Sequence, residues 1–164
     1  MSSDYVQVNH ELRLMTGGEV AGLMAAVLEK KVPFRFTASG FSMAPFIRNG
    51  DVITLKPLPA RLCRGDVVAF IEPCCGKLMV HRIIHVSVAG YLMKGDNNSE
   101  PDGRIPPSSL IGLVVRVEHL GRLVRLGGGR ERAAIAWLSR RGWLIPFVVS
   151  VWRFLKPVAG KWIA

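Results

Sequence analysis

The sequence predicts a mainly β fold with a short N-terminal helix and a basic helical C-terminal tail. Short β-branched runs follow turn residues through the middle of the 164-residue chain. Apolar residues at helical spacing precede these runs, and helical spacing returns after three consecutive glycines at 127–129. The expected divisions are therefore a helical lead-in over 1–33, a β domain over 34–126 and a Trp-rich helical tail over 127–164.

The lead-in is expected to hold one helix, over residues 18–31. Pro33 ends it, because the proline ring cannot continue a helix. Five apolar side chains are expected on one face of this helix: Val20, Leu23, Met24, Val27 and Leu28. The first residues of the chain include acids and lack an apolar h-region, so we expect no secretory signal there.

The expected strands begin with the alternating residues 34–38. Two later β-rich runs each follow a Gly-Asp pair, which is typical of a turn leading into a strand. Residues 95–109 are rich in Gly, Asp, Asn, Pro and Ser, and they predict a loop. After the first strand, the expected strands cover 52–56, 67–71, 78–88, 91–94, 110–118 and 122–126.

The tail carries most of the net charge of +10. Residues 116–164 hold 10 basic and 2 acidic side chains, and all four tryptophans. Helices are expected over 130–141 and 143–155, but the uncharged stretch 142–152 is too short to cross about 30 Å of hydrocarbon. A basic, Trp-rich helix favours peripheral contact with an anionic membrane surface. Packing on the body is the second interpretation of the tail, and nucleic-acid binding is the least favoured.

Composition excludes several classes of protein. A hydrophobic fraction of 49% excludes a disordered chain, and three cysteines exclude a disulfide scaffold. Cys74 and Cys75 are adjacent, with Cys63 nearby, and His81 or His85 could complete a metal site. The adjacent cysteines lack the usual two-residue spacing of zinc ligands, so we expect reduced thiols and neither a metal nor another cofactor.

Three polar residues from separate elements could together perform nucleophilic chemistry. Ser42 lies between a glycine and an Ala-Pro pair, a sequence that can project its hydroxyl. His81 on the long strand could accept the hydroxyl proton, and Asp96 or Asp102 could hold the other ring nitrogen. From spacing alone, a packed or surface histidine and ordinary turn aspartates are the better explanation of these residues.

The order of the surrounding motifs points to a family. The stretch Gly-x-Ser-Met-x-Pro-x4-Gly-Asp, from Gly40 to Asp51, resembles the nucleophile box of type I signal peptidases. The self-cleaving SOS-type repressors share the Ser-Met region and the catalytic β fold. Three further boxes follow in the family order: Arg64-Gly65-Asp66-Val67-Val68, Val80-His81-Arg82-Ile83 and Lys94-Gly95-Asp96-Asn97-Asn98. Together the resemblance covers residues 38 to about 118.

The base box identifies a subtype within that family. Most bacterial members and the repressors have a lysine where this chain has His81, whereas the endoplasmic-reticulum, archaeal and spore-former subtype has histidine. The resemblance implies that Ser42 is the nucleophile, His81 the general base and Asp102 the orienting carboxylate. Asp96 occupies the other acidic position of its box. Lys77 and Lys94 are alternative bases, but neither occupies the base position.

The resemblance also implies a substrate. In the family an extended peptide adds to a sheet edge as a strand, and small side chains precede the cut. Phe36, Met43 and Ile83 are candidates for lining that groove, and each could equally be a core residue. The expected activity is therefore a serine endopeptidase that cleaves signal or precursor peptides.

Some features depart from the family pattern. Members usually carry a membrane anchor before the Ser box, whereas the residues before Ser42 contain no apolar span. We therefore expect peripheral membrane association through the tail. A cytoplasmic location of the active site is one option. Gly40 offers no hydroxyl to an oxyanion, and Phe41 is bulky beside the nucleophile. Alternative functions are a self-cleaving regulator and a non-catalytic membrane-surface or nucleic-acid-binding module. The segment before the Ser box is too short for the DNA-binding domain of a regulator.

Overall fold

The computed structural model describes residues 6–8, 17–124, 126 and 129–140. Its helices are α1 (Gly17–Glu29) and α2 (Gly129–Arg140). A 3-10 turn covers Pro107–Ser109. Its strands are β1 (Val6–Val8), β2 (Phe34–Thr37), β3 (Val52–Lys56), β4 (Val67–Ile71), β5 (Leu78–Ser87), β6 (Gly90–Lys94), β7 (Gly103–Ile105), β8 (Leu110–His119) and β9 (Arg122–Val124).

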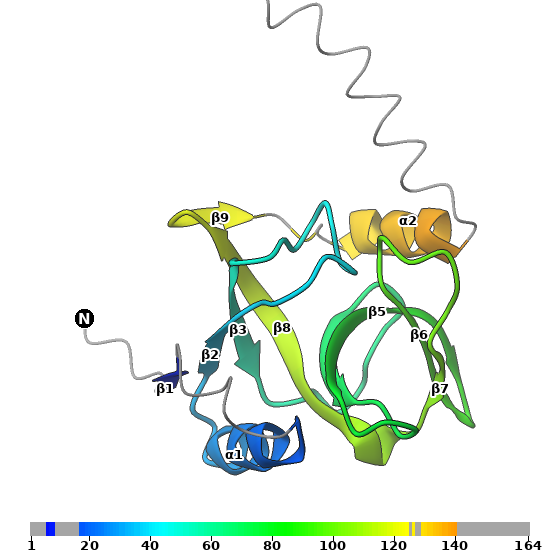
Figure 1. The fold of residues 1–164 in the computed structure, drawn as a ribbon. Helices are drawn as coiled ribbons and strands as arrows, with labels where there is room; N and C mark the ends of the chain where they lie inside the picture. Colours follow the sequence, from blue (N-terminus) through cyan, green and yellow to red (C-terminus); the bar gives the residue numbers. More distant parts are fainter. Residues whose placement is uncertain (1–5, 9–16, 125, 127–128, 141–164) are drawn as a thin grey trace, which may run out of the picture.

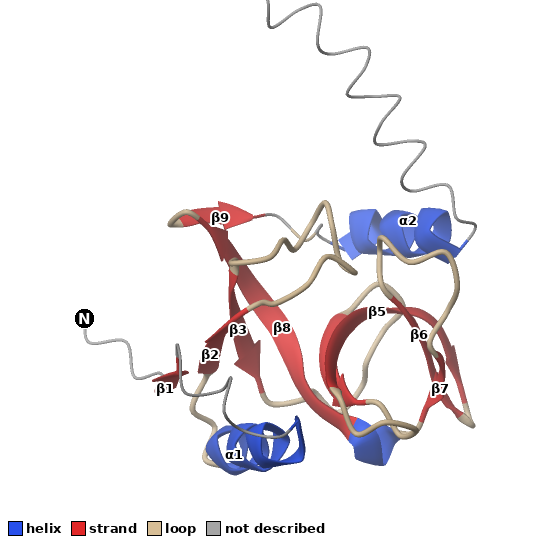
Figure 2. Ribbon diagram, viewed as in Figure 1, coloured by secondary structure: helices blue, strands red, loops and turns tan. Residues whose placement is uncertain are grey.

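The strands form one sheet, so the expected mainly β fold with an N-terminal helix is confirmed (Figures 1 and 2). Its order is β1-β2-β3-β8-β4-β5-β6-β7, and β9 pairs with β8. All pairs are antiparallel except β1 with β2. Because β8 lies between β3 and β4, the strands that follow the Ser42 loop and the strands that carry His81 belong to the same continuous sheet.

The two Gly-Asp pairs form the turns that the sequence predicted. Gly50 and Gly65 have positive φ angles of 89° and 98°, which glycine adopts without a steric penalty. The aspartate that follows each glycine accepts a backbone N–H three residues earlier, Arg48 for Asp51 and Cys63 for Asp66, both at 2.8 Å. Each carboxylate thus closes a turn immediately before a buried strand.

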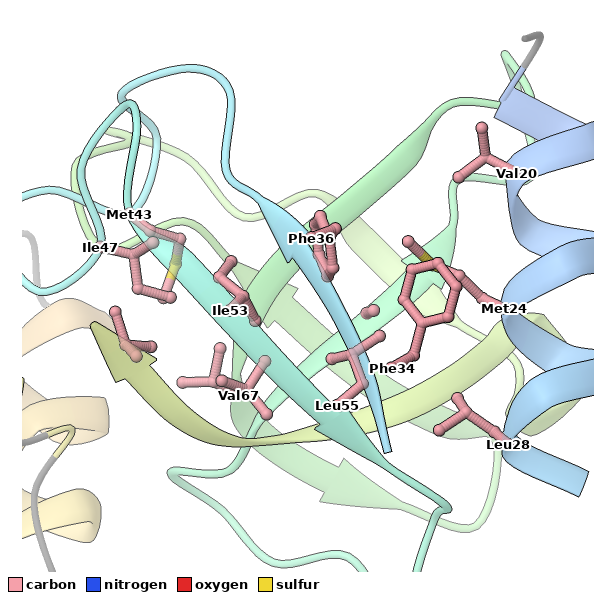
Figure 3. Close-up of a cluster of buried hydrophobic side chains, with 13 residues drawn as sticks. Val20, Met24, Leu28, Phe34, Phe36, Met43, Ile47, Ile53, Leu55 and Val67 are labelled. Atoms are coloured by element: carbon pink, nitrogen blue, oxygen red, sulfur yellow. The ribbon is translucent and has the colours of Figure 1, made fainter. Parts of the chain in front are cut away.

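The apolar side chains form two clusters. The first packs α1 against β2, β3 and β8, and it includes Phe34, Met24, Leu55 and Val117 (Figure 3). The second lies beneath β4, β5 and β6, and includes Phe70 and Met93. The first cluster fixes the strands on either side of the Ser42 loop, and the second supports the strand that carries His81.

Helix α1 begins one residue before the expected helix over 18–31 and ends two residues earlier than it, and one side chain of the expected apolar face is exposed. Val20, Met24 and Leu28 are buried, whereas Leu23 is 36% exposed. The buried residues Val20, Met24 and Leu28 are spaced four apart and form a narrow stripe along the helix. Leu23 lies beside this stripe and stays partly exposed, whereas Ala21 is buried.

The sequence missed two strands. Residues 95–109, expected to be a loop, contain β7 and the 3-10 turn, and β1 was not expected. Both strands have only three residues, too few to give a clear alternation of apolar and polar side chains. The helix expected over 143–155 lies outside the described residues. Across the part of the chain that the structure describes, no helix is long and apolar enough to cross a membrane.

Candidate active site

Ser42 lies in the loop between β2 and β3. The base of this loop is closed by two backbone hydrogen bonds: the N–H of Ala38 donates to Asp51 at 2.7 Å, and the N–H of Gly50 donates to Ala38 at 2.9 Å. Within the loop, Gly40 has a φ of 103°, a conformation that L side chains rarely adopt. The loop is therefore a defined structure that presents Ser42, rather than an open connection.

His81 lies on β5, opposite Val68 of β4. It is only 1% exposed, and its ring packs edge-to-face with the ring of Phe70 at a centroid distance of 6.0 Å. Apolar packing thus fixes the plane of the imidazole and keeps water from most of its surface. The strand pairing determines where the ring points, because successive side chains of a strand alternate between the two faces of the sheet.

The three sequence-predicted residues come together at hydrogen-bond distance. The Oγ of Ser42 lies 2.9 Å from Nε2 of His81, and the Nδ1 of His81 lies 2.5 Å from Oδ2 of Asp102. A neutral imidazole satisfies both contacts when its Nδ1–H donates to Asp102 and its Nε2 accepts the hydroxyl proton of Ser42. In this tautomer the lone pair that can remove a proton faces the hydroxyl.

The segment that carries Asp102 is joined directly to the Ser42 loop. The backbone N–H of Asn97 donates to the carbonyl of Ser42 at 2.7 Å, and its side-chain amide donates to the carbonyl of Phe41 at 3.1 Å. Gly95 allows this approach, because a Cβ there would lie 2.6 Å from the Ser42 carbonyl oxygen. At the other end, the N–H of Asp102 donates to Met93 at 2.9 Å. The loop 95–102 therefore positions both the carboxylate and the nucleophile.

Asp96 has a different partner from Asp102. Its carboxylate accepts two donors of Arg82, from Nε at 2.9 Å and from Nη2 at 2.7 Å, and both side chains are fully buried. A third donor of Arg82 reaches the carbonyl of Gly65 at 2.9 Å, and the guanidinium lies over the ring of Phe46. The sequence left Asp96 and Asp102 as alternatives for orienting His81. The geometry assigns that contact to Asp102 and gives Asp96 a structural ion pair.

The two alternative bases lie elsewhere. Lys77 is exposed in the turn between β4 and β5. Lys94 is buried at the end of β6, and its Nζ donates to the backbone carbonyl of Ser139 in α2. Burial lowers the pKa of Lys94, while the nearby carboxylates of Asp96 and Asp102 act in the opposite direction. The nitrogen that lies beside the Ser42 hydroxyl belongs to His81.

The three candidate groove residues are in the interior. Phe36 and Met43 are 6% and 4% exposed and belong to the first apolar cluster. Ile83 has no exposed surface and belongs to the second, so it does not line a surface groove. Contact of Phe36 and Met43 with a substrate stays a prediction.

The cysteines form neither a disulfide nor a recognisable metal site among the described residues. Cys63, Cys74 and Cys75 are all free and exposed. Within the described ranges, no group of three or more His, Cys, Asp or Glu side chains could hold a metal ion. His85 is exposed on β5, where the register shifts between Ile83 and His85, whereas His81 is buried. The shift interrupts the alternation that would have placed the two rings on one side of the strand.

Sequence reasoning missed two contacts near the site. It did not identify Asn97 as a link between the two loops, although Asn97 lies in the recognised Lys-Gly-Asp-Asn-Asn box. It also missed a second imidazole–carboxylate pair, in which Nδ1 of His119 lies 2.5 Å from Oδ1 of the buried Asp51. These residues are 68 positions apart, and no local pattern connects them.

Compared with known proteins, the sequence matches no protein-family model and no curated protein. The residues and their geometry are therefore the basis for assigning a function.

Proposed function

We propose that this protein is a serine endopeptidase that cleaves signal or precursor peptides after a small residue. The observation that supports the proposal most directly is the chain of two contacts from Ser42 through His81 to Asp102, at 2.9 and 2.5 Å. A serine hydroxyl is a weak nucleophile until a base removes its proton. Here the base is held by a third group, as nucleophilic catalysis requires.

The reaction follows from these contacts. The Oγ of Ser42 attacks the scissile carbonyl while its proton passes to Nε2 of His81, and the carboxylate of Asp102 stabilises the imidazolium that forms. The tetrahedral intermediate collapses as the C–N bond breaks, and His81 returns the proton to the leaving amine. Water, deprotonated by His81, then hydrolyses the ester on Ser42 and regenerates the hydroxyl.

The surroundings of the site suit this cycle. His81 is 1% exposed, so the Ser42–His81 proton transfer takes place largely away from bulk water. In such surroundings charge–charge interactions are stronger than in solvent, which favours stabilisation of the imidazolium by Asp102. The buried Arg82 and Asp96 pair with each other, so Asp96 is engaged by the guanidinium. The carboxylate in contact with His81 is that of Asp102.

The substrate class comes from the family resemblance of the four boxes. An extended peptide with small residues before the cut would be bound through its main chain. Peripheral association with an anionic membrane through the basic tail is part of the proposal, and it rests on the sequence of residues 127–164. Binding of the full chain to anionic vesicles, compared with binding to neutral vesicles, tests this part separately.

The activity is tested by incubating the full chain with precursor peptides that carry Ala-x-Ala sites and analysing the products by mass spectrometry. We expect cleavage after the second alanine by the wild-type protein and none by Ser42→Ala. Ser39→Ala is the matched control, because Ser39 is exposed in the same loop, and it should cleave like the wild type. Equal cleavage by Ser42→Ala and the wild type would contradict the assignment of the nucleophile.

A further inference from the structure

Lys94 connects helix α2 to the candidate active site. Its side chain is 1% exposed, and its ammonium donates to the carbonyl oxygen of Ser139, one residue before α2 ends at Arg140. The last carbonyl groups of a helix have no partner within the helix and carry partial negative charge. A buried lysine ammonium satisfies one of them here, so Lys94 caps the C-terminal end of α2.

Helix α2 is docked on the body through a narrow face. It packs against β5, the strand that carries His81 (Figure 1). Ala136 has no exposed surface and Ser139 is 1% exposed, whereas Ala133 and Ala134 are exposed. The hydroxyl of Ser139 is buried without a hydrogen-bond partner. The polar contact at this end of the helix is therefore made by the Ser139 backbone, and it depends on the helix being docked.

The same ammonium lies close to the carboxylate that orients His81. Lys94 follows Met93, whose carbonyl accepts the N–H of Asp102. Lys94 also interacts electrostatically with both Asp96 and Asp102. Both carboxylate oxygens of Asp96 already accept hydrogen bonds from the buried Arg82, whereas Asp102 contacts His81 through Oδ2. If α2 left the body, Lys94 would lose its acceptor, and we expect Asp102 to replace it because Arg82 occupies Asp96.

We infer that Lys94 is a positioning residue through which docking of α2 controls the Asp102–His81 pair. With α2 docked, Ser139 holds the ammonium and Asp102 holds His81. With α2 released, the ammonium competes with His81 for Asp102, and the imidazole loses its orientation. The inference rests on the proposed function for its effect on catalysis, and it makes the tail that begins with α2 a regulator of the site.

The test is a double-mutant cycle in the full chain. Ala136→Glu introduces a charge into the buried face of α2 and should undock the helix, while Ala134→Glu places the same side chain on its exposed face. We expect Ala136→Glu to speed amide hydrogen exchange in α2 and to lower kcat at least tenfold with little change in KM. Ala134→Glu should match the wild type in both. The loss of kcat should disappear when Lys94→Met is added to Ala136→Glu, because no ammonium is left to compete.

Two measurements separate this inference from the proposed function. The NMR signal of the His81 Nδ1 proton reports the contact with Asp102 without catalysis, and it should be lost in Ala136→Glu and return in the double variant. If the chain cleaves no peptide but shows this pattern of NMR signals, the proposed peptidase function is contradicted and the coupling between α2 and the Asp102–His81 contact is supported. A loss of kcat, or of the His81 signal, that persists in the double variant would overturn the coupling. A wild-type kcat in the single variant Ala136→Glu, with hydrogen exchange showing that its helix is undocked, would overturn it too.

Lys94→Met alone keeps the inference testable if Ala136→Glu does not fold. Removal of the cap should speed exchange of the last amides of α2 severalfold. It should also shift the NMR signal of the His81 Nδ1 proton, because the ammonium that it removes interacts with Asp102, the carboxylate in contact with that nitrogen. Ser139→Ala, which keeps the carbonyl, should do neither. Unchanged exchange and an unchanged signal in Lys94→Met would overturn the inference.

Discussion

Two imidazole–carboxylate pairs with the same contact distance occur among the described residues, and one of them also contacts a serine hydroxyl. His81 with Asp102 and His119 with Asp51 both have an Nδ1 to Oδ distance of 2.5 Å. His81 is almost fully buried, whereas the side chain of His119 is 39% exposed. The Nε2 of His81 meets the Ser42 hydroxyl.

Under the proposed function, the difference indicates which contacts catalysis requires. An aspartate that orients a histidine also serves structure, as Asp51 does when its other oxygen accepts the N–H of Arg48 and closes the turn before β3. The pair of His81 with Asp102 differs in two ways: the Nε2 of His81 contacts the Ser42 hydroxyl, and the histidine is shielded from water. The comparison can be tested by changing corresponding residues in the two pairs.

The largest expected effect separates the two histidines. His81→Ala should lower peptide cleavage at least about 10³-fold, because the Ser42 hydroxyl loses the base that takes its proton. His119→Ala should stay within about twofold of wild type, since no reacting group contacts it. Steady-state kinetics on one precursor peptide measures both. Wild-type activity should also fall at acid pH, where a protonated imidazole cannot accept a proton. Comparable losses in the two variants would remove the distinction between the pairs.

The next effect concerns the orienting carboxylate. Asp102→Asn should lower kcat on the order of 10⁴-fold with little change in KM, because the amide can donate to Nδ1 and favour the tautomer whose Nε2 carries a proton. Asp51→Asn is the matched change in the second pair and should leave kcat within about twofold. A kcat for Asp102→Asn close to that of Asp51→Asn would show that the carboxylate does not orient the base.

A smaller effect, on the free energy of unfolding rather than on catalysis, is expected for the buried carboxylate of Asp96. Asp96→Ala should lower the free energy of unfolding by about 3–5 kcal/mol, because it leaves the fully buried guanidinium of Arg82 without its anion. Urea unfolding followed by circular dichroism measures the change. The double variant with Arg82→Met should recover part of the loss, and a stability equal to wild type in Asp96→Ala would refute the role of the ion pair.

The smallest expected effect sharpens the account of how the nucleophile is positioned. Asn97→Ala removes the side-chain hydrogen bond to the carbonyl of Phe41 and keeps the backbone bond to Ser42. One exposed hydrogen bond contributes about 1 kcal/mol, so kcat should fall roughly fivefold with an unchanged KM. Ser99→Ala, an exposed change in the same loop, is the control. Equal kcat values for the two variants would show that the side chain of Asn97 does not help to position Ser42.

The elements that the sequence predicted well are those whose signal is local. Strands β3 and β4 follow Gly-Asp turns, and the positive φ of each glycine and the capping carboxylate of each aspartate act within four residues. Helix α1 has a clear apolar stripe. By contrast, β1 pairs with β2 across more than twenty intervening residues, and three residues carry too little pattern to predict such a pairing.

The candidate site was predictable only in part, for the same reason. Ser42, His81 and Asp102 were named from the order of the boxes, but nothing local distinguishes Asp102 from Asp96. Asp102 is the aspartate that contacts His81, because the buried guanidinium of Arg82 binds Asp96. The contact between Lys94 and Ser139 joins residues 45 positions apart, and neither residue type signals it.

The bridge that Asn97 and Gly95 make to the Ser42 loop has a consequence for the newly made chain. During translation Ser42 is synthesised first and His81 next. Asn97, whose N–H binds the carbonyl of Ser42, and Asp102, which contacts the His81 ring, are both synthesised later, within residues 95–102. Until that stretch has left the ribosome, the polypeptide carries a serine without an oriented base. If the proposed function holds, a ribosome-bound fragment that ends at residue 94 lacks both Asn97 and Asp102, and we expect it not to cleave peptides.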